Sequence, residues 1–412
     1  MITQDTHLRL TILILASTYP RWDGDPEPGF VHELCKRLAL QHRVLVACPH
    51  AEGAKETELL DGVEITRYRY APAKWETLVN NGGIVNNLRR QPLKVFLLPS
   101  FVIGQFLAAA RLFRKQRFDV VHAHWLLPQG LIAALLQRII APSVPFAITS
   151  HGVDLYALRG RVLTALKRYV GARAAALTVV SSAMRSDANK LGIGCKNITV
   201  QPMGIDFEER FTPSHHVVRS VDQMLFVGRL VEKKGLTYLL EAMPAILEAR
   251  PTVQLKIAGF GPEESALRQQ VRRMHLDSAV QFLGPVPQEA LPMLYRQAAV
   301  FAAPFIRASD GDIEGLGLVV GEAIACHCPV VVGDVPAVKD LIFDAEGGVV
   351  CPLDKAALAA AIIKILADSV SASELARRRR IDLERRLAWP AVADGYSQLL
   401  RAIARPSEPI AQ

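Results

Sequence analysis

The sequence has little of what marks secreted, zinc-binding and membrane-spanning proteins. Only six of its 412 residues are cysteines, scattered at 35, 48, 195, 326, 328 and 351. The one close pair, Cys326 and Cys328, has C-x-C spacing and no accompanying set of histidines, which does not fit a zinc site. No apolar run reaches the roughly 18 residues of a membrane span, and the first one, residues 10–16, has the length of a strand and lacks the features of a signal peptide. We expect a reduced, cytoplasmic protein.

Patterns for dinucleotides, Walker-type phosphate loops and metals are also missing. Gly259-Phe-Gly261 lacks the third glycine of a dinucleotide fingerprint, and no Walker lysine pattern occurs. Asp310-Gly-Asp312 lacks the regular oxygen spacing of a calcium loop. His122-x-His124 has no nearby carboxylate or third imidazole that would complete a metal site. We therefore expect neither a metal nor a cofactor.

Acidic residues are absent between Glu76 and Asp119. This region instead contains seven basic residues on either side of the apolar stretch 95–107, namely Arg89, Arg90, Lys94, Arg111, Arg114, Lys115 and Arg117. The stretch is too short and broken to span a bilayer. An apolar helix between cations is typical of a peripheral contact with an anionic membrane, and equally of a core helix with solvated ends. The net charge of +8 agrees with anionic partners, whether phosphorylated substrates, a membrane surface or nucleic acid, and of these we do not expect nucleic acid.

The length and the order of strand-like and helix-like segments predict two α/β domains. A chain of 412 residues is too long for one ordinary core. In each half, short β-branched apolar runs alternate with helical patterns, which indicates a doubly wound, Rossmann-like parallel sheet. We expect an N-terminal domain over 1–212, completed by a C-terminal helix over 389–405, and a C-terminal domain over 213–388. The polar segment 212–222 is the expected linker, and the two domains should face a common cleft.

The most informative stretch is Glu314-Gly-Leu-Gly-Leu-Val-Val-Gly-Glu322, in which two carboxylates stand eight positions apart. We expect Glu314 on a loop, a helix that begins near Gly317, and Glu322 just inside that helix. The backbone N–H groups of Gly317 and Leu318 would then favour an anion between the two acids. Such a site suits a ligand with hydroxyls at both ends and phosphate in the middle, such as a nucleotide-diphosphate sugar. The alternative is a solvated loop acid and an exposed helix acid.

Basic and histidine side chains are expected at the carboxyl ends of other strands. Arg229 and Lys234 follow the first strand of the C-terminal half, where a guanidinium and an ammonium group would suit a diphosphate. In the N-terminal half, Gly29 opens the first helix and is a candidate for close approach to a ligand, although it is equally a simple helix-start glycine. His151, followed by Gly152 at the end of a strand, is the strongest of the histidine candidates.

Together these segments resemble the family 4 (group 1) retaining glycosyltransferases of GT-B fold. The resemblance covers nearly the whole chain and is carried by five stretches in order: His151-Gly, the run ending at Asp206, Gly228 to Gly235, Glu314 to Glu322, and the following Ala-x-Ala-Cys-x-x-Pro. The sequence departs from the family where Phe30 follows Gly29, since paired glycines are frequent there. It departs again at Gly333-Asp-Val-Pro-Ala337, where Gly-Gly-x-Pro-Glu is frequent.

The resemblance implies a UDP- or GDP-linked hexose donor bound by the C-terminal domain. Arg229 and Lys234 would bind the diphosphate with the amides of Gly317 and Leu318, and the backbone around Val286 would bind the base. Glu322 would bind the ribose and Glu314 the donor sugar hydroxyls, which His151 would also reach. The acceptor would be a glycan or a lipid-linked molecule, in cell-surface or exopolysaccharide synthesis. A nucleotide-sugar epimerase of the same fold, and a non-catalytic sugar-nucleotide-binding protein, are the alternative functions.

Overall fold

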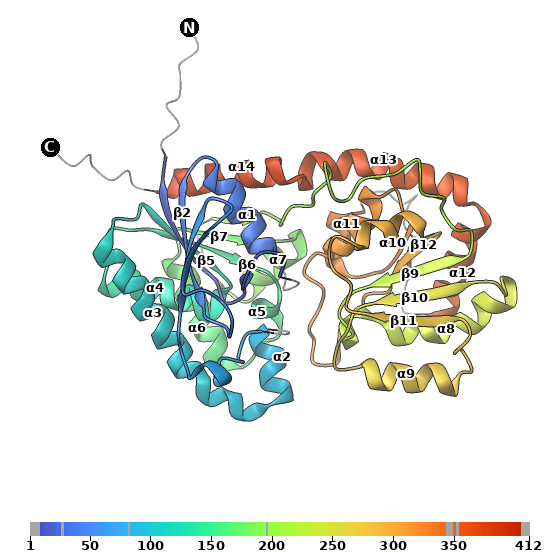
Figure 1. Ribbon diagram of the computed structural model, residues 1–412, viewed down its shortest axis with the longest axis horizontal. Coiled ribbons are helices and arrows are strands. Elements are labelled where there is room, and N and C mark those ends of the chain that lie inside the picture. The colour runs from blue at the N-terminus through green and yellow to red at the C-terminus, as the bar shows by residue number, and fades with distance from the viewer. Residues whose placement is uncertain are drawn as a thin grey trace, which may run out of the picture. The chain divides into compact units, whose positions relative to one another are not determined.

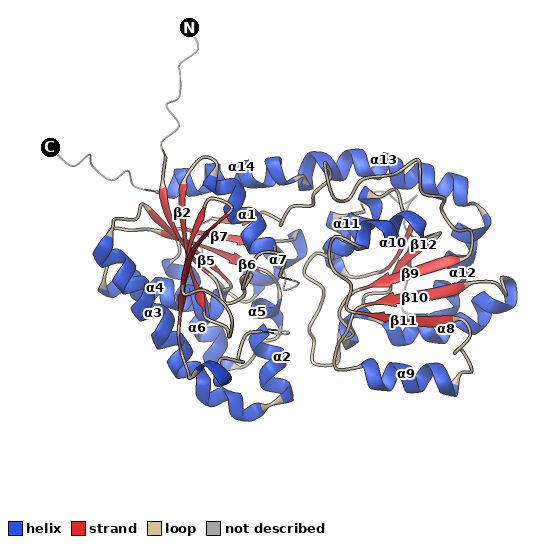
Figure 2. Ribbon diagram, in the orientation of Figure 1, coloured by secondary structure: helices blue, strands red, loops and turns tan. Residues whose placement is uncertain are grey.

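The structure is a computed structural model that describes residues 9–25, 29–80, 83–194, 197–342, 349–351 (backbone only) and 354–404. The chain divides into two compact units (Figure 1). Unit 1 comprises Met1–Gly204 and Pro390–Gln412, and unit 2 comprises Ile205–Trp389. In each unit a parallel sheet is covered by helices (Figure 2). The prediction of two doubly wound α/β domains is confirmed.

Unit 1 contains an eight-stranded sheet in the order β3-β4-β2-β1-β5-β6-β7-β8. Neighbouring strands run parallel except for β3 and β4, which form an antiparallel edge pair. The edge strand β3 was not predicted, because its Thr-Glu-Leu-Leu sequence is half-exposed and lacks a buried apolar run. The strands are β1 (Thr11–Leu15), β2 (Arg43–Pro49), β3 (Thr57–Leu60), β4 (Val63–Tyr68), β5 (Val120–His124), β6 (Phe146–Ser150), β7 (Ala176–Val179) and β8 (Ile198–Val200).

The helices of unit 1 bury one apolar side each. In α1 the residues Val31, Leu34, Cys35 and Leu38 recur at helical spacing and are all buried. The helices are α1 (Phe30–Ala39), α2 (Gly83–Arg90), α3 (Leu98–Lys115), α4 (Leu131–Ile139), α5 (Val153–Tyr156), α6 (Arg161–Arg173), α7 (Ser182–Lys190) and α14 (Trp389–Ile403), with short helical turns at η1 (Ala73–Trp75), η2 (Pro92–Leu97) and η3 (Leu126–Gly130).

Unit 2 contains a six-stranded, all-parallel sheet in the order β11-β10-β9-β12-β13-β14. Its strands are β9 (Gln223–Val227), β10 (Gln254–Ala258), β11 (Val280–Gly284), β12 (Val300–Ala303), β13 (Val330–Gly333) and β14 (Val349–Cys351). Its helices are α8 (Leu236–Ala249), α9 (Glu264–Arg273), α10 (Leu291–Gln297), α11 (Leu318–Ala325), α12 (Lys355–Ala367) and α13 (Ser369–Leu387), with turns at η4 (Glu232–Lys234) and η5 (Pro336–Asp340).

In both sheets the strand order reverses once, and this decides where a ligand can bind. In unit 1 the chain moves outward from β1 and then returns to place β5 beside it. In unit 2 it moves outward from β9 and returns to place β12 beside it. The loops at the carboxyl ends of such a strand pair diverge to opposite faces, so the crevice between them is the usual ligand site of open α/β sheets.

The boundary between the units lies at Gly204/Ile205, eight residues before the expected one. The backbone N–H of Ile205 donates to Leu387 O at 2.7 Å, and the Ile205 side chain packs against Gly321 of α11. The segment 212–222 is held within unit 2 as well, because the Arg219 guanidinium donates to backbone carbonyls of Ala298 and His327. It is therefore not a free linker. Of the expected helix 389–405, the structure describes Trp389–Ile403 as helical, and residue 405 lies outside the described residues.

The apolar stretch of the acid-free region is a continuous helix, not a broken one. Pro92–Lys115 forms 24 residues of helix that by length and composition alone would suffice to cross a membrane, and only 28% of its most apolar part is buried. Its inner side packs through Phe101 and Ala108, and the Gln105 amide donates to Ala16 O and Ala47 O at 3.1 and 2.9 Å. The helix is thus anchored on the sheet by one side only.

Four of the cysteines, Cys35, Cys48, Cys326 and Cys328, are buried free thiols. Burial raises the pKa of the Cys35 thiol to about 12, so this thiol stays protonated near neutral pH. These four residues behave as small core side chains. Cys195 and the side chain of Cys351 lie outside the described residues.

Candidate active site

The candidate residues of unit 2 lie at the carboxyl ends of the two central strands. β9 is followed by Gly228 and Arg229, and Lys234 ends the short turn η4 before α8. β12 is followed by the loop that carries Glu314 and by helix α11. Because β9 and β12 are neighbours, the sheet itself brings these two loops together.

Lys234 and Glu314 form a nearly buried ion pair. The Lys234 Nζ lies 2.9 Å from Glu314 Oε2, and their side chains are 11% and 14% exposed. The ammonium group also lies 4.5 Å from the centre of the Phe305 ring, a cation–π contact. Burial alone would raise the pKa of Glu314, but Lys234, Lys233 and the Gly317 N–H together lower it to about 2. Glu314 is therefore ionised at neutral pH.

Helix α11 begins at Leu318, and Gly317 caps it in the left-handed conformation with φ +85°. A Cβ atom at Gly317 would meet the Phe305 ring at 2.7 Å, so both the backbone and the packing require glycine here. The Val320 N–H donates back to Gly317 O at 2.9 Å. The N–H groups that precede it at the helix start need acceptors outside the helix, and the positive end of the helix dipole adds to their attraction for anions. The helix start is where the sequence predicted it.

Glu322 lies in the buried part of α11 and is only 7% exposed. Its Oε2 accepts a hydrogen bond of 3.0 Å from the Tyr295 hydroxyl. Burial raises the pKa of Glu322 to about 7, although this hydrogen bond and the charges of Arg210 and Lys234 act in the opposite direction. The alternative of an exposed helix acid is thus wrong for Glu322, and a half-charged carboxyl group near neutral pH is available for a polar ligand.

Arg229 and Val286 lie on the loops after β9 and β11, and both side chains are half-buried. The loops approach closely, since Gly259 after β10 leaves no room for a Cβ against the carbonyl of Gly228. Gly228 itself lies near the Lys234 side chain, where a Cβ would be 3.6 Å from Cε. Arg229 and Lys234 therefore belong to one loop cluster at the carboxyl end of the sheet.

The histidine candidate of unit 1 belongs to a stack of imidazoles. His124 at the end of β5 and His151 after β6 lie parallel with ring centres 5.3 Å apart, and His124 Nδ1 is 3.0 Å from His151 Nε2. Burial lowers the pKa of His151 to about 3 and that of His124 well below its ordinary value. Both rings are neutral near pH 7. His151 can therefore act there as a neutral hydrogen-bonding group but not as a cation.

The loop that carries His151 is fixed by Asp154. Its carboxylate accepts hydrogen bonds from the backbone N–H groups of Leu126 and His151 at 2.7 and 3.2 Å and from the Ser150 hydroxyl at 3.0 Å. Phe30 of α1 contacts the His151 ring at a centroid distance of 4.9 Å. His151 is thus held in place from three directions.

Gly29 precedes α1 with φ −85°, an ordinary conformation for any residue. A Cβ there would meet only Pro20 Cγ, at 3.9 Å. Among the described residues, neither backbone nor packing requires glycine at this position, so close approach to a ligand stays a prediction.

Sequence reasoning missed three side chains that shape these sites: Tyr295, Phe305 and His124 as the partner of His151. Tyr295 and Phe305 stand in apolar helix and strand-end contexts that look like ordinary core positions. His124 is recognisable in the sequence as a strand-end histidine of the His122-x-His124 pattern, but not as the partner of His151. Across the described ranges, no group of three or more His, Cys, Asp or Glu side chains is arranged to hold a metal ion.

Comparison with known proteins places this arrangement in a family. Residues 222–368 match the family model described as glycosyl transferases group 1, and residues 30–209 match that of glycosyltransferase family 4. A glycogen synthase of Mycobacterium tuberculosis is 32% identical over 304 residues, which cover 71% of this chain and 70% of that protein. The chain belongs to the family 4 (group 1) glycosyltransferases. The resemblance inferred from the sequence is confirmed.

Other members of the family act on different molecules. A GDP-mannose-dependent monoacylated alpha-(1-6)-phosphatidylinositol monomannoside mannosyltransferase of Corynebacterium glutamicum is 28% identical to this glycosyltransferase over 72% of the chain and 80% of its own length. Among solved structures, sucrose-phosphate synthase from Thermosynechococcus elongatus superposes with a TM-score of 0.77 at 22% sequence identity. The match covers 96% of this chain and 99% of that chain. Anabaena HepE, in complex with UDP and glucose, superposes with a TM-score of 0.71 at 17% sequence identity. That match covers 96% of this chain and 100% of the HepE chain. The fold is therefore GT-B.

Proposed function

We propose that this glycosyltransferase moves a hexose from a UDP- or GDP-linked donor to a glycan or lipid-linked acceptor, with retention of the anomeric configuration. The observation that carries the proposal is the loop cluster at the carboxyl ends of β9 and β12. There an ammonium group, a guanidinium-bearing loop and a helix N-terminus lie beside two buried carboxyl groups. Relatives of the same family are named for glycogen, mannoside and exopolysaccharide synthesis, which agrees with a hexosyl donor.

The proposed donor site uses each group according to its charge. Lys234 has three N–H donors, so it can keep its ion pair with Glu314 and still donate to a diphosphate oxygen. Arg229 and the amide of Leu318 would share the remaining phosphate charge, whereas the Gly317 amide, which now donates to Glu314, would have to turn from that carboxylate to join them. Glu314, ionised and held in place, would accept hydrogen bonds from the sugar hydroxyls.

The remaining roles are those that the resemblance implies. Glu322 would bind the ribose, the backbone around Val286 the base, and neutral His151 a sugar hydroxyl, while Gly29 would allow a ligand to approach the backbone closely. None of these roles requires a metal ion or a cofactor.

In the proposed reaction the bond between the anomeric carbon and the diphosphate oxygen breaks, and its electron pair stays with the diphosphate. The acceptor hydroxyl oxygen bonds to the anomeric carbon on the same face, and its proton passes to the leaving phosphate. The negative charge that develops on the leaving group is stabilised by Lys234, Arg229 and the start of α11. Such preorganised electrostatic stabilisation commonly contributes most to the rate.

A melting-temperature screen tests the donor assignment. We expect a UDP- or GDP-hexose to raise the melting temperature by several degrees at about 100 times its dissociation constant, because a ligand of the native state adds about 2.7 kcal/mol. The selected donor is then incubated alone and with candidate glycan and lipid-linked acceptors. Acceptor-dependent product with retained configuration supports the proposal. Conversion of donor without acceptor identifies the epimerase alternative, and binding without any turnover identifies a non-catalytic protein.

The raised pKa of Glu322 predicts a pH-dependent donor affinity. If ribose hydroxyls donate to its carboxylate, the charged form is favoured in the complex, so binding releases a proton from a group with a pKa of about 7. The affinity for the selected nucleotide sugar should then rise about tenfold from pH 6 to pH 8, as measured by calorimetry. Glu322→Gln should remove this dependence.

Tyr295→Phe is the matched variant, because it removes the hydrogen bond that lowers the pKa of Glu322, and it should move the transition to higher pH. The same raised pKa makes ionisation of Glu322 destabilising. The stability that the neutral Glu322 side chain contributes is complete below the ordinary carboxyl pKa and is lost as the pH rises through about 7. An affinity that is flat with pH in the wild type would contradict the ribose role.

We also propose a peripheral contact with an anionic membrane through the Arg89–Arg117 region. The outer side of the Pro92–Lys115 helix carries exposed apolar residues at helical spacing, Phe96 (77% exposed), Ile103 (56%) and Leu107 (43%), which we call the apolar stripe. The basic clusters around Arg90 and Arg114 lie at its two ends. An apolar helix side flanked by cations suits the boundary between lipid head groups and acyl chains.

A further inference from the structure

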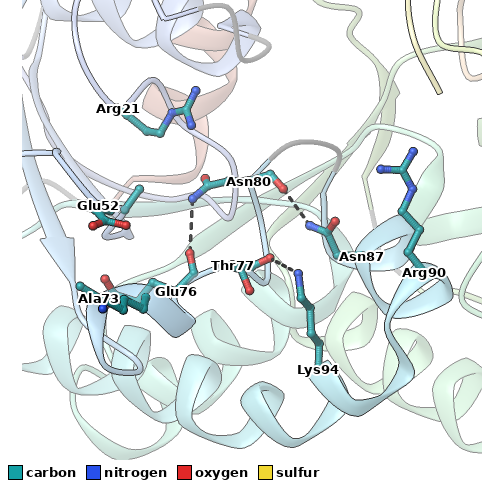
Figure 3. Close-up of a pocket in the computed structure, with 11 residues that line it drawn as sticks. Arg21, Glu52, Ala73, Glu76, Thr77, Asn80, Asn87, Arg90 and Lys94 are labelled. Atoms are coloured by element: carbon teal, nitrogen blue, oxygen red, sulfur yellow. Dashed lines mark hydrogen bonds between the residues drawn. The ribbon is translucent and has the colours of Figure 1, made fainter. Parts of the chain in front are cut away.

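A pocket of about 310 Å³ lies in unit 1 at the N-terminal end of the apolar stripe. It is built by the loops after β1, β2 and β4, helix α2 and the turn η2, and its basic lining residues are Arg21, Lys74, Arg90 and Lys94. Three of these, Arg21, Arg90 and Lys94, are labelled in Figure 3. Its volume is at the lower end of the range of small-molecule sites, about 300–1,000 Å³. None of these residues belongs to the proposed donor site.

The charges of this pocket are unevenly compensated. Arg21 is bound by Asp25, with the guanidinium and carboxylate atoms 2.8 and 2.7 Å apart. Within the part of the chain that the structure describes, no carboxylate lies within 4.0 Å of the charged atoms of Lys74, Arg90 or Lys94. The Lys94 Nζ donates to Thr77 O at 3.0 Å, which leaves two of its N–H groups for another acceptor.

The two acids of the lining do not cancel this positive charge. Glu76 is fully buried and already bound on the protein side, with Oε2 at 2.6 Å from His50 Nδ1 and Oε1 at 3.5 Å from Arg69 Nε. Glu52 is exposed to solvent, where its charge is screened. Two asparagines, Asn80 and Asn87, also line the pocket (Figure 3), but their Nδ2 groups already donate to backbone carbonyls of Glu76, Leu78 and Asn80. The cations of the lining, rather than these amides, suit the pocket to a small anion with several acceptor oxygens.

Three exposed apolar side chains stand next to basic lining residues of the pocket in the chain. Trp75 follows Lys74 in the chain and is 66% exposed, while Leu93 and Phe96 on either side of Lys94 are 78% and 77% exposed. Aromatic and aliphatic side chains next to cations are typical of the interface of a membrane, where the apolar groups enter the lipid and the cations meet phosphates. A soluble phosphate ester would leave these three side chains in water.

We propose that this pocket binds the phosphate-bearing head group of a membrane lipid, with Trp75, Leu93 and Phe96 inserted among the acyl chains. The inference rests on the membrane contact in the proposed function and adds to it a selective site. Phosphate at the pocket would be held by Arg90 and Lys94 in a charge-assisted manner, which a diffuse positive surface does not provide. The head group is identified by its chemistry alone: a phosphate on a lipid anchor.

Vesicle flotation of the full chain tests the assignment with a charge-matched control. The vesicles are phosphatidylcholine alone, and phosphatidylcholine with equal surface charge from phosphatidic acid or from a fatty acid that carries a carboxylate. We expect the wild type to prefer phosphatidic acid, and Arg90→Gln/Lys94→Gln to lose about tenfold or more of that binding. Arg111→Gln/Arg114→Gln removes the same charge near the C-terminal end of α3, away from the pocket, and should keep the preference. Equal losses of binding in the two double variants, or no preference of the wild type for phosphatidic acid, would overturn the assignment of the pocket to a lipid phosphate.

Three further measurements separate the sources of failure. Leu93→Ser/Phe96→Ser should abolish flotation with every lipid, whereas Val162→Ser, an exposed apolar residue (74%) on α6, should not. Tight binding of soluble glycerol 3-phosphate without vesicles, with no further gain from lipid, would assign the pocket to a soluble phosphate ester and overturn the lipid assignment. The increase in melting temperature on adding the nucleotide sugar should be the same for Arg90→Gln/Lys94→Gln as for the wild type. This measurement distinguishes a failure of the lipid site from a failure of donor binding.

Discussion

Lys234→Ala should lower the rate of glycosyl transfer by about 10² to 10³-fold, because it removes a preorganised cation from the leaving diphosphate. It should also lower the free energy of unfolding by about 3 kcal/mol, since it leaves the nearly buried carboxylate of Glu314 without its main partner. Transfer is measured with the donor selected by the melting screen, and unfolding with guanidinium. Lys233→Ala is the matched control. Lys233 lies in the same turn and is 14% exposed, but it pairs with Asp312 at 3.3 Å. We expect it to keep most of the activity.

Stability and catalysis are separated by a double-mutant cycle on the same pair. Glu314→Gln removes the carboxylate that Lys234 would leave unpaired, so Lys234→Ala/Glu314→Gln should recover much of the lost stability. It should not recover transfer, because the diphosphate still lacks its ammonium partner and the sugar hydroxyls lack the carboxylate. If the double variant regains both stability and transfer, the pair has only a structural role.

The pH dependence of the wild type gives an independent measure of the pair. The pKa of Glu314 is about 2, below the ordinary value of 4.5, so the stability it contributes is complete above about pH 5 and is lost as the pH falls toward 2. Lys234→Ala should lose little additional stability over that range, because its Glu314 no longer has a depressed pKa.

The sequence predicted the architecture well because both sheets are buried on two faces. Strands such as β1, β9 and β13 are short, mostly buried runs of apolar residues, which have few alternatives to a central parallel strand. It predicted the edge of unit 1 poorly, because β3 is half-exposed and its pairing depends on β4 rather than on its own pattern. The unit boundary was misplaced for a related reason. Polar residues over 212–222 look like a linker, but Arg219 uses its polarity to bind backbone carbonyls inside unit 2.

At the site, the sequence identified charged residues but not their partners. Glu314, Lys234 and Glu322 could be selected because acids and bases near glycine at strand ends are uncommon in a core. The pairing of Lys234 with Glu314 and of Glu322 with Tyr295 depends on how separate loops and helices pack. The partners are 80 residues apart in the chain in the first pair and 27 residues apart in the second. The pKa values near 2 and 7 follow from this packing and have no signal in the sequence. The roles of these residues in binding a donor stay predictions.

Gly235→Ala should be the most destabilising single-methyl change in the loop after β9. Gly235 joins η4 to α8 in the left-handed conformation with φ +68°, and a Cβ there would collide with the backbone carbonyl of Pro304 after β12. The conformation costs a non-glycine residue about 1–2 kcal/mol. Overpacking against an atom that cannot rotate away adds about 1–3 kcal/mol. The expected loss of about 2–5 kcal/mol is measured by guanidinium unfolding.

Gly284→Ala separates the conformational cost of that loss of stability from the cost of overpacking. Gly284 has nearly the same backbone conformation, φ +73°, but no atom lies within 4 Å of the position of its Cβ. It should therefore show only the conformational cost of about 1–2 kcal/mol. Because Gly235 follows Lys234 directly, relief of the collision must move the ammonium group away from Glu314, so Gly235→Ala should also lose transfer. Equal destabilisation by the two variants would show that the loops after β9 and β12 are not in the close contact on which the donor site depends.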